Sequence, residues 1–184
     1  MFSPLNSSVI IVCGPNALPR SGRVGIISGP GGTAVGTTDM CFQLGLDIPR
    51  LSGPTVERLR RTIPWAGSSV QNPVDLGFTS LTAPHVYREA IKVLAEETNV
   101  DMLLVVAVVG GEAFRDMILE AIGGMKTRKP LVLTIMASSM HSKGQDLPLF
   151  LSSGISVYPD SVRAAKALAR LWEYARFRAR RSLV

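Results

Sequence analysis

The residues best suited to chemistry form a glycine-rich corner near the N-terminus. A β-branched run, Arg23–Ser28, leads into Gly29-Pro30-Gly31-Gly32-Thr33, and a helical pattern follows. Glycine has no side chain, so a ligand can approach the backbone closely. The first amides of a helix have no intrahelical acceptor and carry a partial positive charge. The corner therefore predicts an anion site, most often for phosphate. A tight strand-to-helix turn that needs glycine for its geometry alone is the alternative.

This corner departs from the common nucleotide-binding loops. Gly29, Gly31 and Ala34 satisfy the spacing G-x-G-x-x-A, but the expected second strand ends in Arg50-Leu51-Ser52, which offers no carboxylate for a ribose. No Lys-Ser or Lys-Thr pair follows the glycines, so a Walker loop is excluded. Ser28 and Thr33 offer hydroxyls to FMN, but no Trp or Tyr lies nearby in the chain. Nicotinamide binding is disfavoured, and an FMN-binding electron carrier stays open as a minor alternative.

Two further loops are expected beside this corner. The segment Asn72–Gly77 holds a carboxylate, Asp75, and the segment Val109–Glu112 forms a second glycine-bearing corner. Asp75 could orient backbone donors or a basic group of a partner, or it could satisfy its own Asx turn. The predicted supporting residues of the site are Asn72, Asp75, Gly110 and Gly111.

No catalytic side chain and no metal site are predicted in this chain. His85 falls in the first turn of an expected helix, and His141 falls in a polar loop. Neither an H-x-x-x-H nor a C-x-x-C spacing occurs, and a G-x-S-x-G elbow is also absent from the sequence. Cys13 and Cys41 make no disulfide framework, so a reducing, cytoplasmic location is the default expectation.

The elements that must position these loops alternate between strand and helix. Strands are expected at Arg23–Ser28, Ile48–Leu51, Met102–Val109, Leu131–Met136 and Ile155–Tyr158. Helices are expected after the first glycines, from about Thr82, around Phe114–Ile122, and after Pro159-Asp160. This alternation predicts an α/β, three-layer, flavodoxin-like (Rossmann-like) domain with a parallel five-stranded sheet in the order 2-1-3-4-5. Ligands of such sheets bind at the carboxyl ends of the strands, so the three loops should share one rim.

The distribution of charge bears on the domain organisation and on the partners. We expect a lead-in segment at residues 1–22, the flavodoxin-like domain at 23–178 and a basic end at 179–184. The net charge is +6, and four arginines lie in the last nine residues. A surface that binds single-stranded nucleic acid needs aromatic residues interleaved with basic ones, and we expect no such stripe here. Nucleic acid is therefore not an expected partner. No apolar run reaches the roughly 20 residues of a membrane span, so no membrane partner is expected.

Five segments, taken in order, resemble a known family. They are Val24–Asp39, Asn72–Leu76, Val105–Gly111, Lys129-Pro130 and Gly154–Pro159. Together they look like the C-terminal flavodoxin-like (succinyl-CoA ligase-like) domain of the NDP-forming acyl-CoA synthetases, the succinyl-CoA synthetase superfamily. The resemblance covers roughly residues 21–175.

The resemblance implies that this chain is a domain or subunit of an acid–CoA ligase. In that family an acyl phosphate and a phosphohistidine link the nucleotide to the thioester. The helix after Gly31-Gly32-Thr33 would stabilise a phosphohistidine supplied by another domain, because no Ser-His-Thr-Gly-like segment occurs here. The implied partners are a CoA-binding/phosphohistidine domain and an ATP-grasp domain. CoA and ATP/ADP or GTP/GDP with Mg would serve the assembled enzyme, while this chain alone would bind no cofactor and be inactive. A non-catalytic regulatory module that binds CoA or a nucleotide is the alternative.

Overall fold

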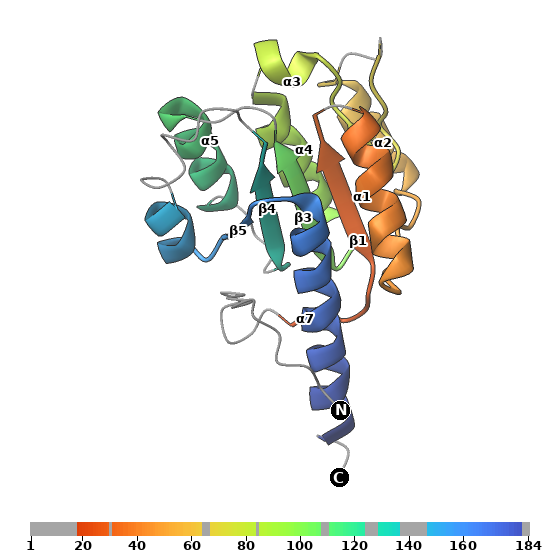
Figure 1. Cartoon of the computed structure of the whole chain (residues 1–184). Coiled ribbons are helices and arrows are strands. Elements are labelled where there is room, and N and C mark those ends of the chain that lie inside the picture. The colour runs from red at the N-terminus through yellow and green to blue at the C-terminus, as the bar shows by residue number, and fades with distance from the viewer. Residues whose placement is uncertain are drawn as a thin grey trace.

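Five parallel strands form the centre of the molecule (Figure 1), in a computed structural model that describes residues 18–29, 31–63, 67–83, 85–107, 111–123, 129–136 and 147–181. The strands are β1 (Val24–Ser28), β2 (Val74–Asp75), β3 (Met102–Ala107), β4 (Leu131–Ile135) and β5 (Ser156–Tyr158). They are arranged in the order β2-β1-β3-β4-β5, and every neighbouring pair is parallel. The predicted fold class and strand order are confirmed.

Helices cover both faces of this sheet (Figure 1), which explains why β1, β3 and β4 are buried along their whole length. On one face, α1 (Gly31–Gln43) and α7 (Ser161–Arg181) pack over an apolar cluster that includes Leu104 and Leu168. On the other face, a larger cluster lies beneath three helices. These are α2 (Gly53–Arg60), α4 (His85–Glu96) and α5 (Glu112–Gly123). The short helix α3 (Thr79–Thr82) lies beyond the carboxyl edge of the sheet.

The second strand is not where the sequence pattern predicted it. Residues 48–51 are not a strand, and the edge of β1 pairs instead with Val74–Asp75. The chain before Pro49 makes only an isolated bridge, in which Asp47 pairs with Arg23. Proline has no N–H to continue a ladder. Two residues suffice at this edge, but they were too few to show a strand pattern in the sequence.

The remaining predicted elements are confirmed within a few residues. The third strand is described to Ala107, and the fourth and fifth begin or end one residue away from their predicted limits. Helix α5 buries the predicted face, with Phe114 and Ile118 inside, and ends at Gly123. Helix α7 runs from Ser161 to Arg181.

Arginine and aromatic side chains interleave at the end of α7, contrary to the sequence-based expectation. Arg176 lies 5.8 Å from the ring centre of Trp172, and Arg181 lies 4.8 Å from that of Phe177. Each pair is four residues apart on one helix, a spacing at which side chains stack on their own helix. These contacts therefore stabilise the helix end and need no external ligand.

Candidate functional site

The predicted anion corner lies where β1 passes into α1, at the carboxyl edge of the sheet. Strand β1 ends at Ser28, and α1 begins at Gly31. The amide of Gly29 donates to the carbonyl of Val106 at 3.1 Å and so continues the sheet ladder. That amide is therefore already used. The first turn of α1 is the next part of the corner whose amides lack an acceptor within a helix. Pro30 lies outside the described residues.

Hydroxyl groups fix the geometry of this first turn. The Ser28 and Thr33 hydroxyl oxygens lie 2.6 Å apart, and Ser28 is completely buried. The Thr37 hydroxyl donates to the carbonyl of Thr33 at 2.7 Å. The first turn holds no acidic side chain of its own. The partial positive charge of the helix end is thus not neutralised from within α1.

Asp75, from the neighbouring strand β2, brings a carboxylate to this corner. Its Oδ1 accepts a hydrogen bond from the Gly77 amide at 2.8 Å, which closes an Asx turn. Its Oδ2 lies 2.5 Å from the place where a Cβ on Gly31 would stand. The two predicted loops are therefore brought together, with Gly31 in contact with Asp75.

The two glycines at the start of α1 differ in the space around them. A side chain on Gly31 would collide with the Asp75 carboxylate, whereas no atom of the described residues comes within 4 Å of a Cβ added to Gly32. Gly31 therefore permits the close approach of α1 to β2. Among the described residues, the space beside Gly32 is open.

Asn72 was predicted to support the rim but lies elsewhere. Its Oδ1 accepts from the Ile26 amide at 3.0 Å, and its Nδ2 donates to the carbonyls of Val24 and Pro49 at 2.8 and 3.0 Å. The side chain thus forms hydrogen bonds with the middle of β1 that a neighbouring strand would otherwise form. It holds the edge of the sheet at Val24 and Ile26, at least two residues before β1 ends at Ser28.

Of the third predicted loop, the structure describes Gly111 and Glu112, which lead into a helix on the other face of the sheet. Gly111 adopts a φ of +94°, which favours glycine, and precedes α5. Helix α5 packs over the face opposite to α1. Gly111 therefore does not join Gly31 and Asp75 through any described contact, and Gly110 lies outside the described residues. His85 is exposed at the start of α4, and His141 also lies outside the described residues.

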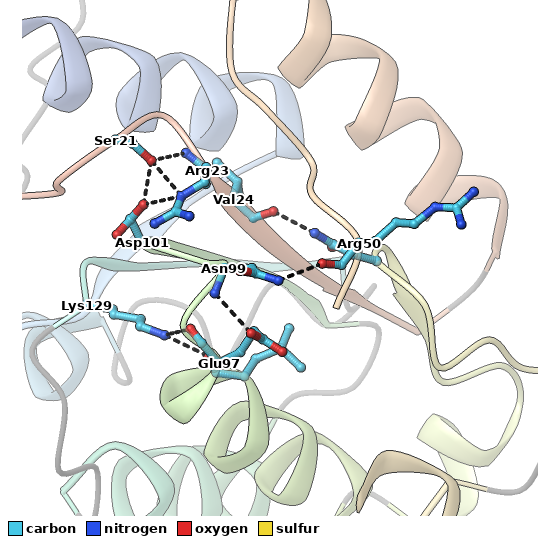
Figure 2. A network of polar contacts seen from close by, with 10 residues as sticks. Ser21, Arg23, Val24, Arg50, Glu97, Asn99, Asp101 and Lys129 are labelled. Carbon is cyan, nitrogen blue, oxygen red and sulfur yellow. Dashed lines mark hydrogen bonds and ion pairs between the residues drawn. The ribbon is translucent and has the colours of Figure 1, made fainter. Parts of the chain in front are cut away.

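A second polar cluster occupies the opposite, amino edge of the sheet (Figure 2). Glu97, 2% exposed, accepts hydrogen bonds from the amide and hydroxyl of Ser52, both at 2.8 Å, and from the Asn99 amide at 3.0 Å. Burial alone would raise the pKa of Glu97. The donors of Asn99, Thr55 and Ser52 outweigh it and lower the pKa to about 2.

The same edge holds three further charged groups, Lys129, Asp101 and Arg23 (Figure 2), and a cleft of about 370 Å³. Lys129 donates to the carbonyls of Leu94 and Glu97 at the end of α4, and burial lowers the pKa of its ammonium. Burial would raise the pKa of Asp101, but hydrogen bonds from Arg23 and Ser21 lower it. These contacts join the ends of α4, β1 and β3, so we assign the cluster to the stability of the fold.

Other kinds of site find no support in the described part of the chain. No group of three His, Cys, Asp or Glu side chains could hold a metal ion there. Burial raises the pKa of the Cys41 thiol to about 12, so this thiol is not a nucleophile at neutral pH. Among the helices that the structure describes, none combines the length and apolar character needed to span a bilayer.

One feature of the rim was missed by the sequence analysis. Phe78 follows Gly77 and is 88% exposed. Gly77 has a φ of +56°, and a Cβ there would lie 2.4 Å from the carbonyl oxygen of Gly67, so only glycine fits. This turn directs Phe78 outward. An aromatic residue directly after a predicted ligand loop was the available signal.

The chain is similar to one part of several longer proteins. It is 33% identical over 156 residues to acetate–CoA ligase [ADP-forming] II subunit alpha of Pyrococcus furiosus, a match that covers 80% of this chain and 33% of the relative. It is 28% identical to acetate–CoA ligase [ADP-forming] I of Archaeoglobus fulgidus, over 88% of this chain and 22% of the relative. The chain thus spans about a third or less of these relatives. No protein-family model matches it.

Solved structures show the same similarity in three dimensions. A crystal structure of a Pyrococcus horikoshii protein superposes with a TM-score of 0.77 and 30% identity, over 87% of this chain and 37% of the other. The dinucleotide forming acetyl-coenzyme A synthetase 1 of Ca. Korarchaeum cryptofilum, in complex with phosphate and ADP, gives a TM-score of 0.76 at 20% identity. That match covers 92% of this chain and 37% of the synthetase and supports the shared fold.

Proposed function

Since the chain belongs to the NDP-forming acyl-CoA synthetase superfamily as its flavodoxin-like domain, we propose that it is the phosphate-cradling component of an acid–CoA ligase. The start of α1, at Gly31, Gly32 and Thr33, would hold the phosphoryl group of a phosphohistidine that another domain supplies. Preorganised amides at that position stabilise negative charge without proton transfer. The observation that carries the proposal is the open backbone at Gly32, at the head of a helix whose first turn is uncharged.

Asp75 gives this cradle a preference for a phosphorylated imidazole. Its Oδ1 is held by the Gly77 amide, while Oδ2 faces the start of α1. When one ring nitrogen of a histidine carries the phosphoryl group, the other can donate its N–H to a carboxylate, which fixes the ring. Asp75 would thus position the imidazole while the α1 amides hold the phosphoryl oxygens.

The rest of the reaction would lie in other modules. CoA, the nucleotide and Mg would bind to the CoA-binding and ATP-grasp domains of the same enzyme, in one chain or as subunits. This chain would contribute no covalent catalyst, and alone it would form no thioester. A non-catalytic regulatory module that binds CoA or a nucleotide is the second candidate, and turnover that depends on the α1 corner would argue against it.

The test separates charge from shape at Gly32. Gly32→Asp puts a carboxylate at the helix start, where it favours the helix but repels a phosphoryl group. Gly32→Asn has nearly the same shape without the charge. In the assembled enzyme we expect Gly32→Asp to slow phosphohistidine turnover about 100-fold and Gly32→Asn to slow it far less. Gly31→Asp is less informative, because any side chain there displaces Asp75.

Three results would contradict this proposal. The first is equal activity of Gly32→Asp and the unsubstituted enzyme. The second is equal loss in the Asp and Asn variants, which would indicate shape rather than charge. The third is acid-dependent formation of CoA thioester by the isolated chain, which would overturn the division of labour between the domains.

A further inference from the structure

The positive charge of the chain is concentrated on one helix. Helix α7 carries seven basic side chains and one acidic side chain, Glu173. It therefore holds the whole formal net charge of +6, and the rest of the chain is neutral overall. Basic residues that lie along a single helix create a local positive field, which attracts polyanions to that side of the molecule.

The last turns of α7 stand clear of the domain. The buried side chains of the helix end at Ala175, and every residue from 176 to 181 is exposed. Figure 1 shows this end of the helix beyond the sheet. Interaction with the helix dipole explains basic residues in the last turn of a helix. It does not account for the exposed aromatic side chains among the arginines.

Two of these aromatic side chains lie on the same face of α7 as arginines. Tyr174 is 48% exposed and Phe177 is 50% exposed. Four side chains follow one another at intervals of four, three and four residues and so share one helix face, namely Arg170, Tyr174, Phe177 and Arg181. We call these four residues the α7 stripe. Within it, the guanidinium of Arg181 lies 4.8 Å from the centre of the Phe177 ring.

Single-stranded nucleic acid is the polyanion that matches this arrangement. Its phosphates pair with arginines, and its bases stack on aromatic rings and on the planes of guanidinium groups. The stripe is about 16 Å long at 1.5 Å per residue, which is enough for several nucleotides stacked about 3.4 Å apart. The contact between Arg181 and Phe177 holds the guanidinium in place before a ligand arrives, so less side-chain entropy is lost on binding.

Two other anionic occupants match the stripe less well. A helix that binds an anionic membrane inserts its apolar face into the bilayer. The apolar face of α7, with Ala165 and Leu168, is instead buried against the sheet. A carboxylate-rich protein surface would pair with the arginines, but it gives no reason for half-exposed aromatic rings between them.

We infer that the α7 stripe binds single-stranded nucleic acid with little sequence preference, through phosphates at its arginines and bases stacked on Tyr174 and Phe177. This inference goes beyond the proposed function and does not depend on the corner at α1. The sequence analysis expected no such partner, because it placed no aromatic side chains on the exposed face of this helix.

Fluorescence anisotropy of the full chain with a labelled RNA of about 12 nucleotides, within the usual range of site sizes, tests this inference. We expect a Kd between about 1 and 100 µM near physiological salt, the range of non-specific binding. Arg170→Gln/Arg181→Gln should weaken binding and reduce the slope of log Kd against log salt by about 1.4, since each phosphate contact on a single strand contributes about 0.7. The matched control is Arg58→Gln/Arg60→Gln on α2, which removes the same charge from two surface ion pairs and should leave both quantities nearly unchanged.

A second pair of variants tests the stacking. Tyr174→Ser/Phe177→Ser should weaken RNA binding about 10-fold or more. Because both rings are half-exposed, the unfolding midpoint should stay the same. Phe78→Ser, at a side chain that is 88% exposed at the carboxyl edge, should change neither the binding nor the midpoint.

Four results would overturn the inference. The first is a Kd for the RNA above about 1 mM, weaker than ordinary non-specific binding. The second is equal weakening by the two arginine pairs, which would indicate net charge and not the stripe. The third is unchanged RNA binding by Tyr174→Ser/Phe177→Ser. The fourth is tighter binding of polyglutamate or of phosphatidylserine vesicles than of RNA, which would point to an acidic protein or to a membrane.

Discussion

Replacing Glu97 by Gln should weaken the fold in a strongly pH-dependent way. The carboxylate is buried and accepts hydrogen bonds from Ser52, Thr55 and Asn99. Ser52 stands directly before α2, and Asn99 also donates to the carbonyl of Arg50. One carboxylate therefore fastens the start of α2 to the end of α4. Glutamine keeps the size of the side chain but removes its charge.

The magnitude follows from the pKa of Glu97. The pKa falls from an ordinary value of 4.5 to about 2 in the folded chain, which corresponds to roughly 3 kcal/mol of native-state stability. Because the folded pKa is the lower one, this stability is fully present above pH 4.5. It is lost as the pH falls from about 4.5 towards 2. At pH 7, Glu97→Gln should therefore cost up to roughly 3 kcal/mol, or about 6 to 12 °C in the unfolding midpoint.

Urea unfolding between pH 2 and pH 7 measures this effect in the isolated chain. Glu96→Gln is the matched control, because the neighbouring carboxylate is half-exposed and pairs with Arg58 at the surface. Such a pair contributes about 0 to 1 kcal/mol. The gap between Glu97→Gln and the unsubstituted chain should close as the pH falls towards 2. A gap that stays constant across this range would refute the argument, as would equal losses in the two variants.

Two further predictions concern the sheet and the glycines. Asn72→Ala removes three hydrogen bonds to the backbone, two to β1 and one to the carbonyl of Pro49, so the free energy of unfolding should fall by about 2 to 4 kcal/mol. Urea titration measures it, and a loss below about 0.5 kcal/mol would contradict the assignment. Gly36→Ala should stabilise the isolated chain by about 0.5 to 1 kcal/mol, because its Cβ meets open space inside a helix. Gly25→Ala should destabilise it by about 1 to 3 kcal/mol, because its Cβ would lie 3.0 Å from side-chain atoms of Leu94 and Val100. A lower urea midpoint for Gly36→Ala than for Gly25→Ala would contradict both predictions.

The strand order could be predicted because the buried strands are marked in the sequence itself. The run from Met102 to Ala107 is apolar at every position, as a strand covered on both faces requires. The edge strand could not be found in this way. Its two residues pair with β1, and the Asn72 side chain just before them bonds to β1; both are tertiary contacts without a periodic pattern.

The glycine-bearing corner between β1 and α1 could be predicted in its place but not in its details. A glycine run between a strand and a helix locates the corner, and Gly31 is required there because a Cβ would collide with the Asp75 carboxylate. The hydrogen bonds between β1 and β3 decide which amides of the corner already have an acceptor. The last of them, from the Gly29 amide to the carbonyl of Val106, is set by the register of these two strands. The exposure of Phe78 depends on the turn at Gly77, which becomes visible only when Gly67 lies beside it.

Asp75 also bears on which of the candidate functions the corner can serve. A regulatory site that captures a free nucleotide or CoA needs positive side chains around the phosphate, as well as backbone amides. Residues 31–38 and 67–83 offer none, and the one charge that they place at the corner is negative. A free phosphate would therefore meet repulsion from Asp75 that the helix end only partly offsets. A phosphoryl group on an imidazole would bring its own N–H donor to that carboxylate. Under the proposed function, the carboxylate would thus favour a delivered phosphohistidine over a diffusing anion.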